Sequence, residues 1–316
     1  MRARPHGAVR VPMVAEENQA ASSEADFLGL LHNTTRSHLG TVVLWPRETL
    51  VTKVEDILRQ ALTMGLSPGR ASKLYGIVNF LALGMFGRVG QAGLNAIKDR
   101  VHESTWEVTP KLAEAFAFLH DVFKLRPVRE YTLFEADAHR VLMASDASYE
   151  DGVGKAGFLI ISDPGKPTEE RVGVVVDIAA LGPLEDLWGQ QDTYITQLEL
   201  LTVIVALVEC ASLFRNSRGL YFVDNVSALM AMVKGRSKVE SLDSLARLGH
   251  FASFALGASA YYEYVQSDSN WSDEISREGL EGPWARQHGF KIRTCTFEHR
   301  LLRLPCIALC LVIGFL

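Results

Sequence analysis

Cysteine is scarce in this chain of 316 residues, and its four copies form no metal-binding or disulfide framework. No Cys-x-x-Cys pair occurs, and no histidines stand at the spacing of zinc ligands. These absences exclude zinc-finger modules and dithiol redox motifs. We therefore expect a protein of a reducing compartment, with Cys210 in the core of an apolar helix.

An excess of positive charge is also missing, since the formal net charge is -5. A protein that bound nucleic acid by bulk charge alone would be basic. Any contact with nucleic acid must therefore use local cationic patches or bound metal cations. The hydrophobic content of 48% and charged content of 22% are globular values, which fit two modest domains or one domain with extensions.

Neither end of the chain carries a long apolar run. Residues 1–23 contain three arginines but no apolar core of a secretory signal. Residues 304–316 are strongly apolar, yet this stretch is shorter than the roughly 20 residues that a spanning helix needs. We expect an intracellular protein, cytoplasmic or nuclear, with no obligate membrane partner. The apolar end is interpreted as a packing segment or tail, with membrane association as the weaker alternative.

The first half of the chain predicts a pair of strands followed by helices. Residues 1–25 are mixed and polar, which indicates a flexible lead. Short apolar runs at 26–30 and 40–45, separated by a polar turn, predict a hairpin. From 52 to 125 the apolar spacing becomes helical, and Ser67-Pro68 is a good helix start.

From residue 140 onward the pattern becomes that of a mixed α/β domain. Three apolar strands with short turns predict an antiparallel meander, at 141–145, 156–162 and 171–178. The expected elements after them are a long buried helix at 195–214, a strand at 220–223, helices at 226–233 and 239–256, a strand at 260–265 and a helix at 271–278. This order predicts a mixed five-stranded sheet with helices on its faces.

Four carboxylates fall at the ends of these elements, where open sheets usually place their sites. They are Asp146 after the first strand, Glu199 early in the long helix, Asp224 after the fourth strand and Asp273 at the last helix. Buried acids repel one another, and a divalent cation removes that repulsion and suits oxygen ligands. The set therefore predicts a metal site.

Each acid taken singly also has an ordinary structural interpretation. Asp146 fits a turn, and Glu199 has capping-box spacing from Thr196. Asp224 fits an N-cap, and Asp273 favours a helix N-terminus through the helix dipole. The order of all four acids, on suitable elements, favours the metal site.

The four positions resemble the motifs of ribonuclease H domains in retroelement reverse transcriptases, over about 140–279. The matching pieces are Ser145-Asp146-Ala147-Ser148, Gln197-Leu198-Glu199-Leu200, Val223-Asp224-Asn225, and Asn270 with Asp273, Ser276 and Arg277. The resemblance implies a ribonuclease H-like domain at 138–280, with a C-terminal tail at 281–316. It also implies an endonuclease that hydrolyses the RNA strand of RNA–DNA hybrids and leaves a 5′-phosphate.

The resemblance further implies catalysis with two divalent ions, Mg²⁺ or Mn²⁺. Asp146 is then the shared ligand, Glu199 and Asp224 complete one ion, and Asp273 completes the other. A histidine that often precedes the last aspartate of the family is missing here, because residues 266–269 contain none. His250 is interpreted as a core histidine rather than a substitute.

Several polar residues are expected to contact the nucleic acid. Gln197 and Asn225 are candidates for the 2′-hydroxyls of the RNA strand, and Asn270 is grouped with them. Their ordinary interpretation is solvent-facing polar residues. A basic loop between two helices is a candidate for backbone phosphates, or else a solvated loop, and it contains Lys234, Arg236 and Lys238.

Residues 26–135 resemble, more weakly, the palm end and the thumb or connection of such polymerases. The pieces that carry this resemblance are at 27–30, 73–76 and 86–90, and a generic helical domain is the alternative. No Tyr-x-Asp-Asp motif of a polymerase centre occurs, so the chain looks like a downstream fragment of a retroelement polyprotein. Its expected partners are an RNA–DNA hybrid and a polymerase region of the same polyprotein.

Three functional hypotheses follow. The first is an active metal-dependent ribonuclease H. The second is an inactive retroelement remnant that folds and binds nucleic acid without cleaving it. The third is a relative of exonucleases or integrases, which share the fold but use fewer or differently spaced acids.

Overall fold

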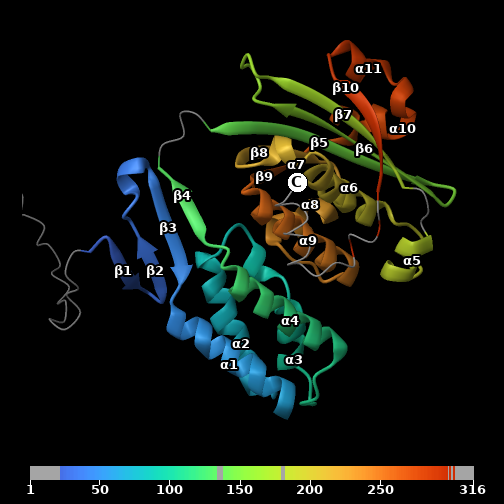
Figure 1. The fold of residues 1–316 in the computed structure, drawn as a ribbon. Coiled ribbons are helices and arrows are strands. Elements are labelled where there is room, and N and C mark those ends of the chain that lie inside the picture. Colours follow the sequence, from blue (N-terminus) through green and yellow to red (C-terminus); the bar gives the residue numbers. More distant parts are fainter. Residues whose placement is uncertain (1–21, 134–137, 179–181, 298, 300–301, 303–316) are drawn as a thin grey trace, which may run out of the picture.

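The structure is a computed structural model that describes residues 22–133, 138–178, 182–297, 299 and 302. Figure 1 shows an N-terminal part of strands and helices beside a larger part built on a mixed sheet. The expected flexible lead at 1–25 lies almost wholly outside the described residues, although its last two residues belong to the first strand.

A four-stranded antiparallel sheet opens the described chain, in the order β1-β2-β3-β4. Its strands are β1 (Glu24–Phe27), β2 (Leu30–Asn33), β3 (Thr41–Pro46) and β4 (Arg129–Thr132). The expectation of one strand at 26–30 is wrong, because this run folds into a hairpin of its own. Leu28 and Gly29 have positive φ angles of 49° and 77°, which suit a two-residue hairpin turn.

Four helices follow this sheet's third strand and pack around one apolar core. They are α1 (Glu48–Met64), α2 (Pro68–Leu81), α3 (Leu94–Val101) and α4 (Pro110–Leu125). The predicted start of α2 is confirmed, since the Ser67 side chain accepts a hydrogen bond from the backbone N–H of Arg70. Thr109 caps α4 in the same way, through the N–H of Leu112.

The larger sheet has six strands in the order β10-β7-β6-β5-β8-β9. The strands are β5 (His139–Glu150), β6 (Val153–Ser162), β7 (Glu170–Asp177), β8 (Ser217–Val223), β9 (Ser259–Tyr264) and β10 (Lys291–Thr296). The predicted meander is confirmed, because β5, β6 and β7 pair antiparallel. The strands β8 and β9 continue the sheet in parallel with β5. The chain therefore has a ribonuclease H-like mixed sheet flanked by helices.

The sixth strand was not expected from the sequence. Residues 281–316 were predicted to be a tail, but α11 (Pro283–Gln287) and β10 lie within this range. Strand β10 pairs in parallel with β7 and covers its open edge, whose backbone groups need partners. The apolar residues 303–316 lie outside the described part of the chain. None of the described helices has the length and apolar character of a membrane-crossing segment.

Helices cover both faces of the larger sheet (Figure 1). One face carries α6 (Ile195–Glu209), α8 (Val226–Lys234) and α9 (Glu240–Leu256), packed on the main core. The predicted burial of α6 on all sides is confirmed for Gln197 to Leu207. The other face carries α10 (Asp273–Glu278), with Ile275 against Leu159. Two short helices, α5 (Gly182–Trp188) and α7 (Ala211–Phe214), flank α6 in sequence.

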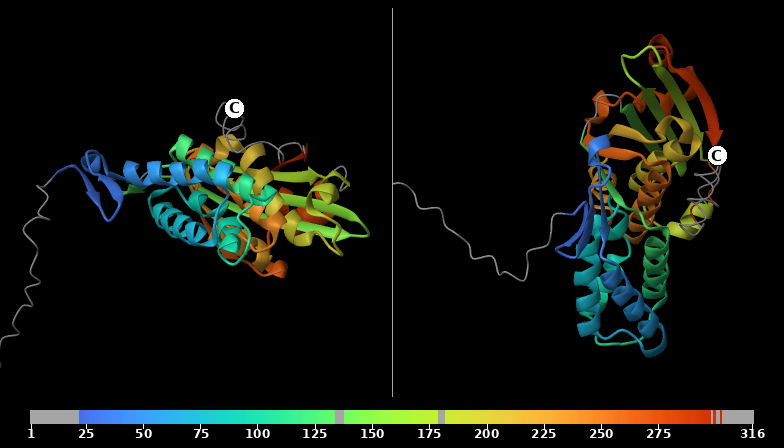
Figure 2. Two further views of the ribbon diagram at one scale, coloured as in Figure 1. Left: turned by 90° about the horizontal axis from the view of Figure 1, so that it is seen from below. Right: turned by 60° about the vertical axis from the view of Figure 1, so that its left-hand side comes forward.

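The N-terminal helices pack against α9 of the larger part, and Figure 2 shows the two parts side by side. Phe251 of α9 belongs to the core of the N-terminal helices and meets Phe118 of α4 edge to face, with 5.3 Å between ring centroids. Phe254 contacts Phe86 in a tilted arrangement at 5.8 Å. The two parts are therefore joined by apolar packing, to which α9 contributes on both of its sides.

Candidate metal centre

Asp146 lies inside β5, between the strands β8 and β6. Strand β8 stops pairing with β5 just before Asp146, whereas β6 continues to pair beyond it. The parallel ladder between β5 and β8 ends at the pair Ser145 and Val223. The expectation that Asp146 follows its strand is wrong, because β5 continues to Glu150, with Asp146 opposite Gly157 of β6. Since β8 stops first, the side of β5 at Asp146 is open to groups at the end of β8. Asp224 is the first residue there.

Glu199 enters the same region from α6. Its Oε1 accepts a hydrogen bond of 3.1 Å from the backbone N–H of Ala147 on β5. The capping-box interpretation does not hold, because α6 begins at Ile195 and its N-cap is Tyr194. The Oε2 of Glu199 is buried, and no hydrogen-bond donor from the described residues reaches it. A buried charged oxygen without a partner is costly, so this atom fits a cation.

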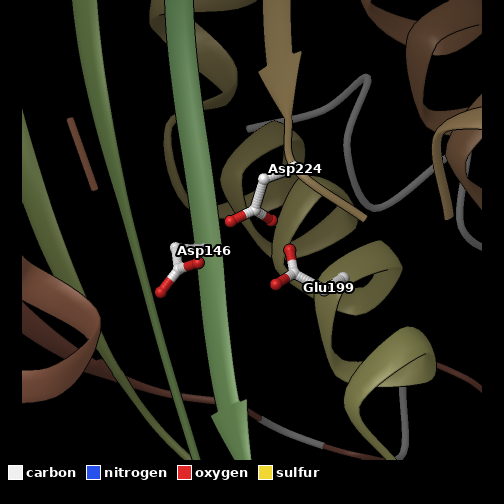
Figure 3. Close-up of side chains that lie close together, drawn as sticks. All are labelled: Asp146, Glu199 and Asp224. Carbon is white, nitrogen blue, oxygen red and sulfur yellow. The ribbon is translucent and has the colours of Figure 1, made fainter. Parts of the chain in front are cut away.

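Asp224 completes a compact group with these two acids. Single ligand oxygens of Asp146, Glu199 and Asp224 all lie within 4.8 Å of one another. Figure 3 shows the three carboxylates close together. Asp224 is not the N-cap of α8, because that role belongs to Asn225. The Oδ1 of Asn225 accepts hydrogen bonds of 3.1 Å from the N–H groups of Ser227 and Ala228. The Asp224 carboxylate therefore remains available to the group.

The two buried acids are shifted toward their neutral forms. Burial raises the pKa of Asp146 to about 7, and repulsion from Asp224 and Asp273 adds to this effect, while the Ser276 hydrogen bond opposes it. Burial likewise raises the pKa of Glu199 well above its usual range, with further repulsion from Asp224 and Asp146. Acids held together against this cost fit a cation that removes the repulsion.

Asp273 lies close enough to raise the pKa of Asp146, but it does not belong to the 4.8 Å group. It is the first residue of α10, and its Oδ1 accepts a hydrogen bond of 2.8 Å from Nε of Arg277. The same two groups form an ion pair at i,i+4 spacing. The structure thus brings three of the four predicted acids together and leaves the fourth at the border, paired with a cation.

Ser276 has a contact that the sequence did not indicate. Its hydroxyl is buried and donates a short hydrogen bond to Oδ2 of Asp146, across 130 residues of chain. The only sequence signal was its place in the matched motif, one helical turn after Asp273. Which strand that face of α10 would meet depends on tertiary packing.

Two of the predicted nucleic-acid contacts are used inside the protein. Asn270 is buried, and its amide donates to the carbonyl of Ser145 at 2.9 Å while its Oδ1 accepts from Ser272. Gln197 is also buried and donates from Nε2 to Gln191 and Ser241. The expected solvent-facing position of Gln197 is therefore wrong, and both residues form hydrogen bonds within the protein.

The remaining predicted contacts lie at the surface. Asn225 is half-buried, with Nδ2 at 3.4 Å from Oγ1 of Thr196. Lys234 and Lys238 are exposed, and Arg236 is half-buried with Nη1 at 3.4 Å from the Tyr75 hydroxyl. His250 is a core histidine as predicted, since its Nε2 lies 2.8 Å from the carbonyl oxygen of Met232, and burial lowers its pKa to about 4.

No protein-family model matches the sequence, and a comparison with curated proteins also gives no match. Among solved structures, the chain is similar to the N-terminal ribonuclease H domain of Rv2228c from Mycobacterium tuberculosis, solved as a fusion with maltose-binding protein. That match has 14% identity and a TM-score of 0.32, and it covers 48% of this chain and all of that domain's chain.

Two further solved structures are similar to this chain at the same level of identity. Ribonuclease H1 of the archaeon Halobacterium salinarum matches with 14% identity and a TM-score of 0.33, covering 45% of this chain and 98% of its own. A foamy viral protease–reverse transcriptase in complex with double-stranded DNA matches with 14% identity and a TM-score of 0.27, covering 77% of this chain and 38% of its own. The ribonuclease H-like fold of this chain rests on its own strand order and pairing directions, with three antiparallel strands followed by parallel strands on one side.

Proposed function

We propose that this chain is a ribonuclease H-like endonuclease that hydrolyses the RNA strand of RNA–DNA hybrids with two divalent cations, Mg²⁺ or Mn²⁺. The observation that carries the proposal is the meeting of Asp146, Glu199 and Asp224, with ligand oxygens within 4.8 Å of one another. Within the described residues, no other group of three or more potential ligands comes together in this way.

The proposed roles are those that the resemblance to ribonuclease H domains implies. Asp146 is the shared ligand, Glu199 and Asp224 complete one cation position, and Asp273 completes the other. When bound, such cations activate the attacking water and stabilise the leaving oxygen of a phosphodiester. The Ala147 N–H holds Oε1 of Glu199, which leaves Oε2 as its coordinating atom. Asp273 must share its carboxylate with Arg277 or separate from it.

The proposed nucleic-acid surface uses local positive charge, because the chain as a whole is acidic. Lys234 is the last residue of α8, and Arg236 and Lys238 follow it in the loop before α9. All three would contact backbone phosphates. This loop rests on the N-terminal helices through Asn95, whose Nδ2 donates to the Ser237 carbonyl at 2.6 Å and to Oδ1 of Asp243 at 2.8 Å. Asn225 remains the candidate for contact with the RNA strand.

Cleavage of a labelled RNA–DNA hybrid, followed during a Mg²⁺ titration, tests this function. We expect the RNA strand alone to be cut, with cleavage lost in Asp146→Asn and retained in Asp268→Asn, a matched change at an exposed aspartate. Cleavage of DNA duplexes instead would favour an exonuclease or integrase type of activity. Hybrid binding without any cleavage by the wild-type protein would refute the nuclease.

The second candidate function is a retroelement remnant that binds hybrid without cutting it. One observation favours it: Asp273 is ion-paired with Arg277 and lies outside the three-acid group. In either case we propose a retroelement origin, with a polymerase region of the same polyprotein as partner. The cleavage assay separates the two candidates, since only the first shows a Mg²⁺-dependent product.

A further inference from the structure

Ser276 links the carboxylate of the central strand to the helix that carries Asp273. Its hydroxyl is buried and bonds to Oδ2 of Asp146. The same oxygen lies 2.9 Å from the backbone carbonyl of Asp273, one turn earlier in α10. The Ser276 hydroxyl therefore contacts the carboxylate of Asp146 and the backbone of Asp273, which belong to elements far apart in the sequence.

Two glycines of the sheet let α10 come close enough for this contact. A Cβ atom at Gly157 would lie 2.9 Å from Cγ2 of Ile275 and 3.0 Å from the backbone nitrogen of Ser276. A Cβ atom at Gly173 would lie 3.1 Å from Cδ1 of Ile275. Gly157 is also the register partner of Asp146. The backbone of α10 thus rests directly on the strand beside the acid, where a larger residue would hold it away.

We propose that Ser276 is a positioning residue of the cation site, which holds Oδ2 of Asp146 and leaves Oδ1 as the coordinating atom. The second acid of the group is held by the same means, since the Ala147 N–H fixes one oxygen of Glu199. Each buried acid then has one oxygen bound by the protein and one oxygen for the cation. This inference rests on the proposed function, because it assumes that the three acids bind metal.

Partners that orient metal ligands usually change metal affinity by 10- to 100-fold when they are removed. We therefore expect Ser276→Ala to weaken Mn²⁺ binding by roughly 10-fold or more. Ser276→Thr keeps the hydroxyl, and its affinity should stay within about threefold of wild type, a change smaller than that range. Ser253→Ala is the matched control, because Ser253 is also buried and donates to a carbonyl, that of Gly249, within α9.

The experiment is Mn²⁺ titration of the full chain by calorimetry, with the melting temperature of each metal-free variant measured in parallel. A merely structural role would lower the melting temperature and leave the Mn²⁺ affinity of the folded protein unchanged. The proposed role lowers the affinity in Ser276→Ala alone, and Ser276→Thr restores it. If Ser276→Ala does not fold, Ser276→Cys places a slightly larger group with a weaker donor at the same position and takes its place under the same criterion.

The possible results separate this inference from the proposed function. Wild-type affinity in a folded Ser276→Ala protein that still binds Mn²⁺ overturns the positioning role alone. A Ser276→Thr variant that melts at the wild-type temperature but binds Mn²⁺ as weakly as Ser276→Ala also overturns it, since the hydroxyl would then be irrelevant. A wild-type protein that binds no Mn²⁺ overturns the proposed function itself.

Discussion

Asp146 and Asp224 stand one step beyond the last pair of the parallel ladder between β5 and β8, which is Ser145 with Val223. Paired residues of neighbouring parallel strands project to the same face, so the two acids meet where β8 ends. The longer β5 continues past this point through its antiparallel pairing with β6. A difference in strand length thus creates the open position that Glu199 of α6 then fills from the side.

Glu199→Gln should separate cation binding from folding. The glutamine keeps an oxygen for the Ala147 N–H but removes an acid whose charged form is disfavoured by burial and by repulsion from Asp224 and Asp146. We expect the metal-free protein to become more stable near neutral pH and its Mg²⁺ affinity to fall by more than about 100-fold, beyond the effect of an outer partner. Thermal unfolding with and without Mg²⁺ measures both quantities. Unchanged Mg²⁺ stabilisation would show that Glu199 is not a ligand.

The metal-free protein should lose stability as the pH rises from about 4 to above 7. The folded-state pKa of Asp146 is about 7, above its unfolded value of 3.8, so its contribution is complete below the unfolded pKa and disappears through the folded one. A tenfold difference in proton affinity between the folded and unfolded states corresponds to roughly 1.4 kcal/mol. Urea unfolding in the presence of a chelator at several pH values measures how the free energy of unfolding falls with pH. This fall should become smaller in Asp146→Asn, and an unchanged fall in that variant contradicts the assignment.

His250 should produce the opposite pH dependence, in which the protein loses stability as the pH falls into the acidic range. Burial lowers its folded-state pKa to about 4 from 6.5, so its contribution is complete above the unfolded pKa and is lost as the pH falls toward 4. The difference corresponds to about 3 kcal/mol at most. The same urea series should show this loss, which His250→Gln removes. If the loss of stability at acidic pH persists unchanged in His250→Gln, other groups cause it.

Lys238→Ala should weaken hybrid binding in a salt-dependent way. Lys238 is exposed in the basic loop beside α9, and a contact with one phosphate contributes about one to the slope of the salt dependence of binding. We expect lower affinity at low salt. The slope of log K against log salt, which is negative, should become smaller in magnitude by about one. Fluorescence anisotropy of a labelled hybrid measures the slope. Lys124→Ala, at an exposed lysine of α4, is the control and should leave it unchanged.

Phe251→Ala should destabilise both parts of the molecule together. Phe251 is fully buried on α9, yet it packs in the core of the N-terminal helices against Phe118. Removal of such a ring costs about 3–5 kcal/mol. Calorimetry should show one transition at a lower temperature. Two separate transitions, with the larger one unshifted, would mean that α9 does not couple the two parts.

The amino-acid pattern was sufficient for much of the local structure. The Ser67-Pro68 start of α2, the all-round burial of α6 and the antiparallel meander follow from caps, periodicity and turns, which depend on near neighbours in sequence. The positions of Asp146, Glu199 and Asp224 at the ends or beginnings of apolar elements also led to the prediction that they meet. The structure brings these three together, and their role as metal ligands remains a prediction.

Other features depended on contacts between distant segments. Strand β10 was missed because its residues are mostly polar at an edge, and only the free edge of β7 explains its pairing. Gln197 has the polar character of a surface residue, but α6 is enclosed on that side by Ser241 and Gln191.

The sequence by itself determined the start of α2, the burial of α6, the meander of β5 to β7 and the order of the acids along the chain, because these are local properties. Tertiary structure alone decided that Asp273 lies at the border of the group, and that Ser276 reaches Asp146. The physical reason is that these contacts depend on how closely α10 approaches the sheet. Two glycines on neighbouring strands, Gly157 and Gly173, set that distance. The sequence of α10 itself does not show where these glycines lie.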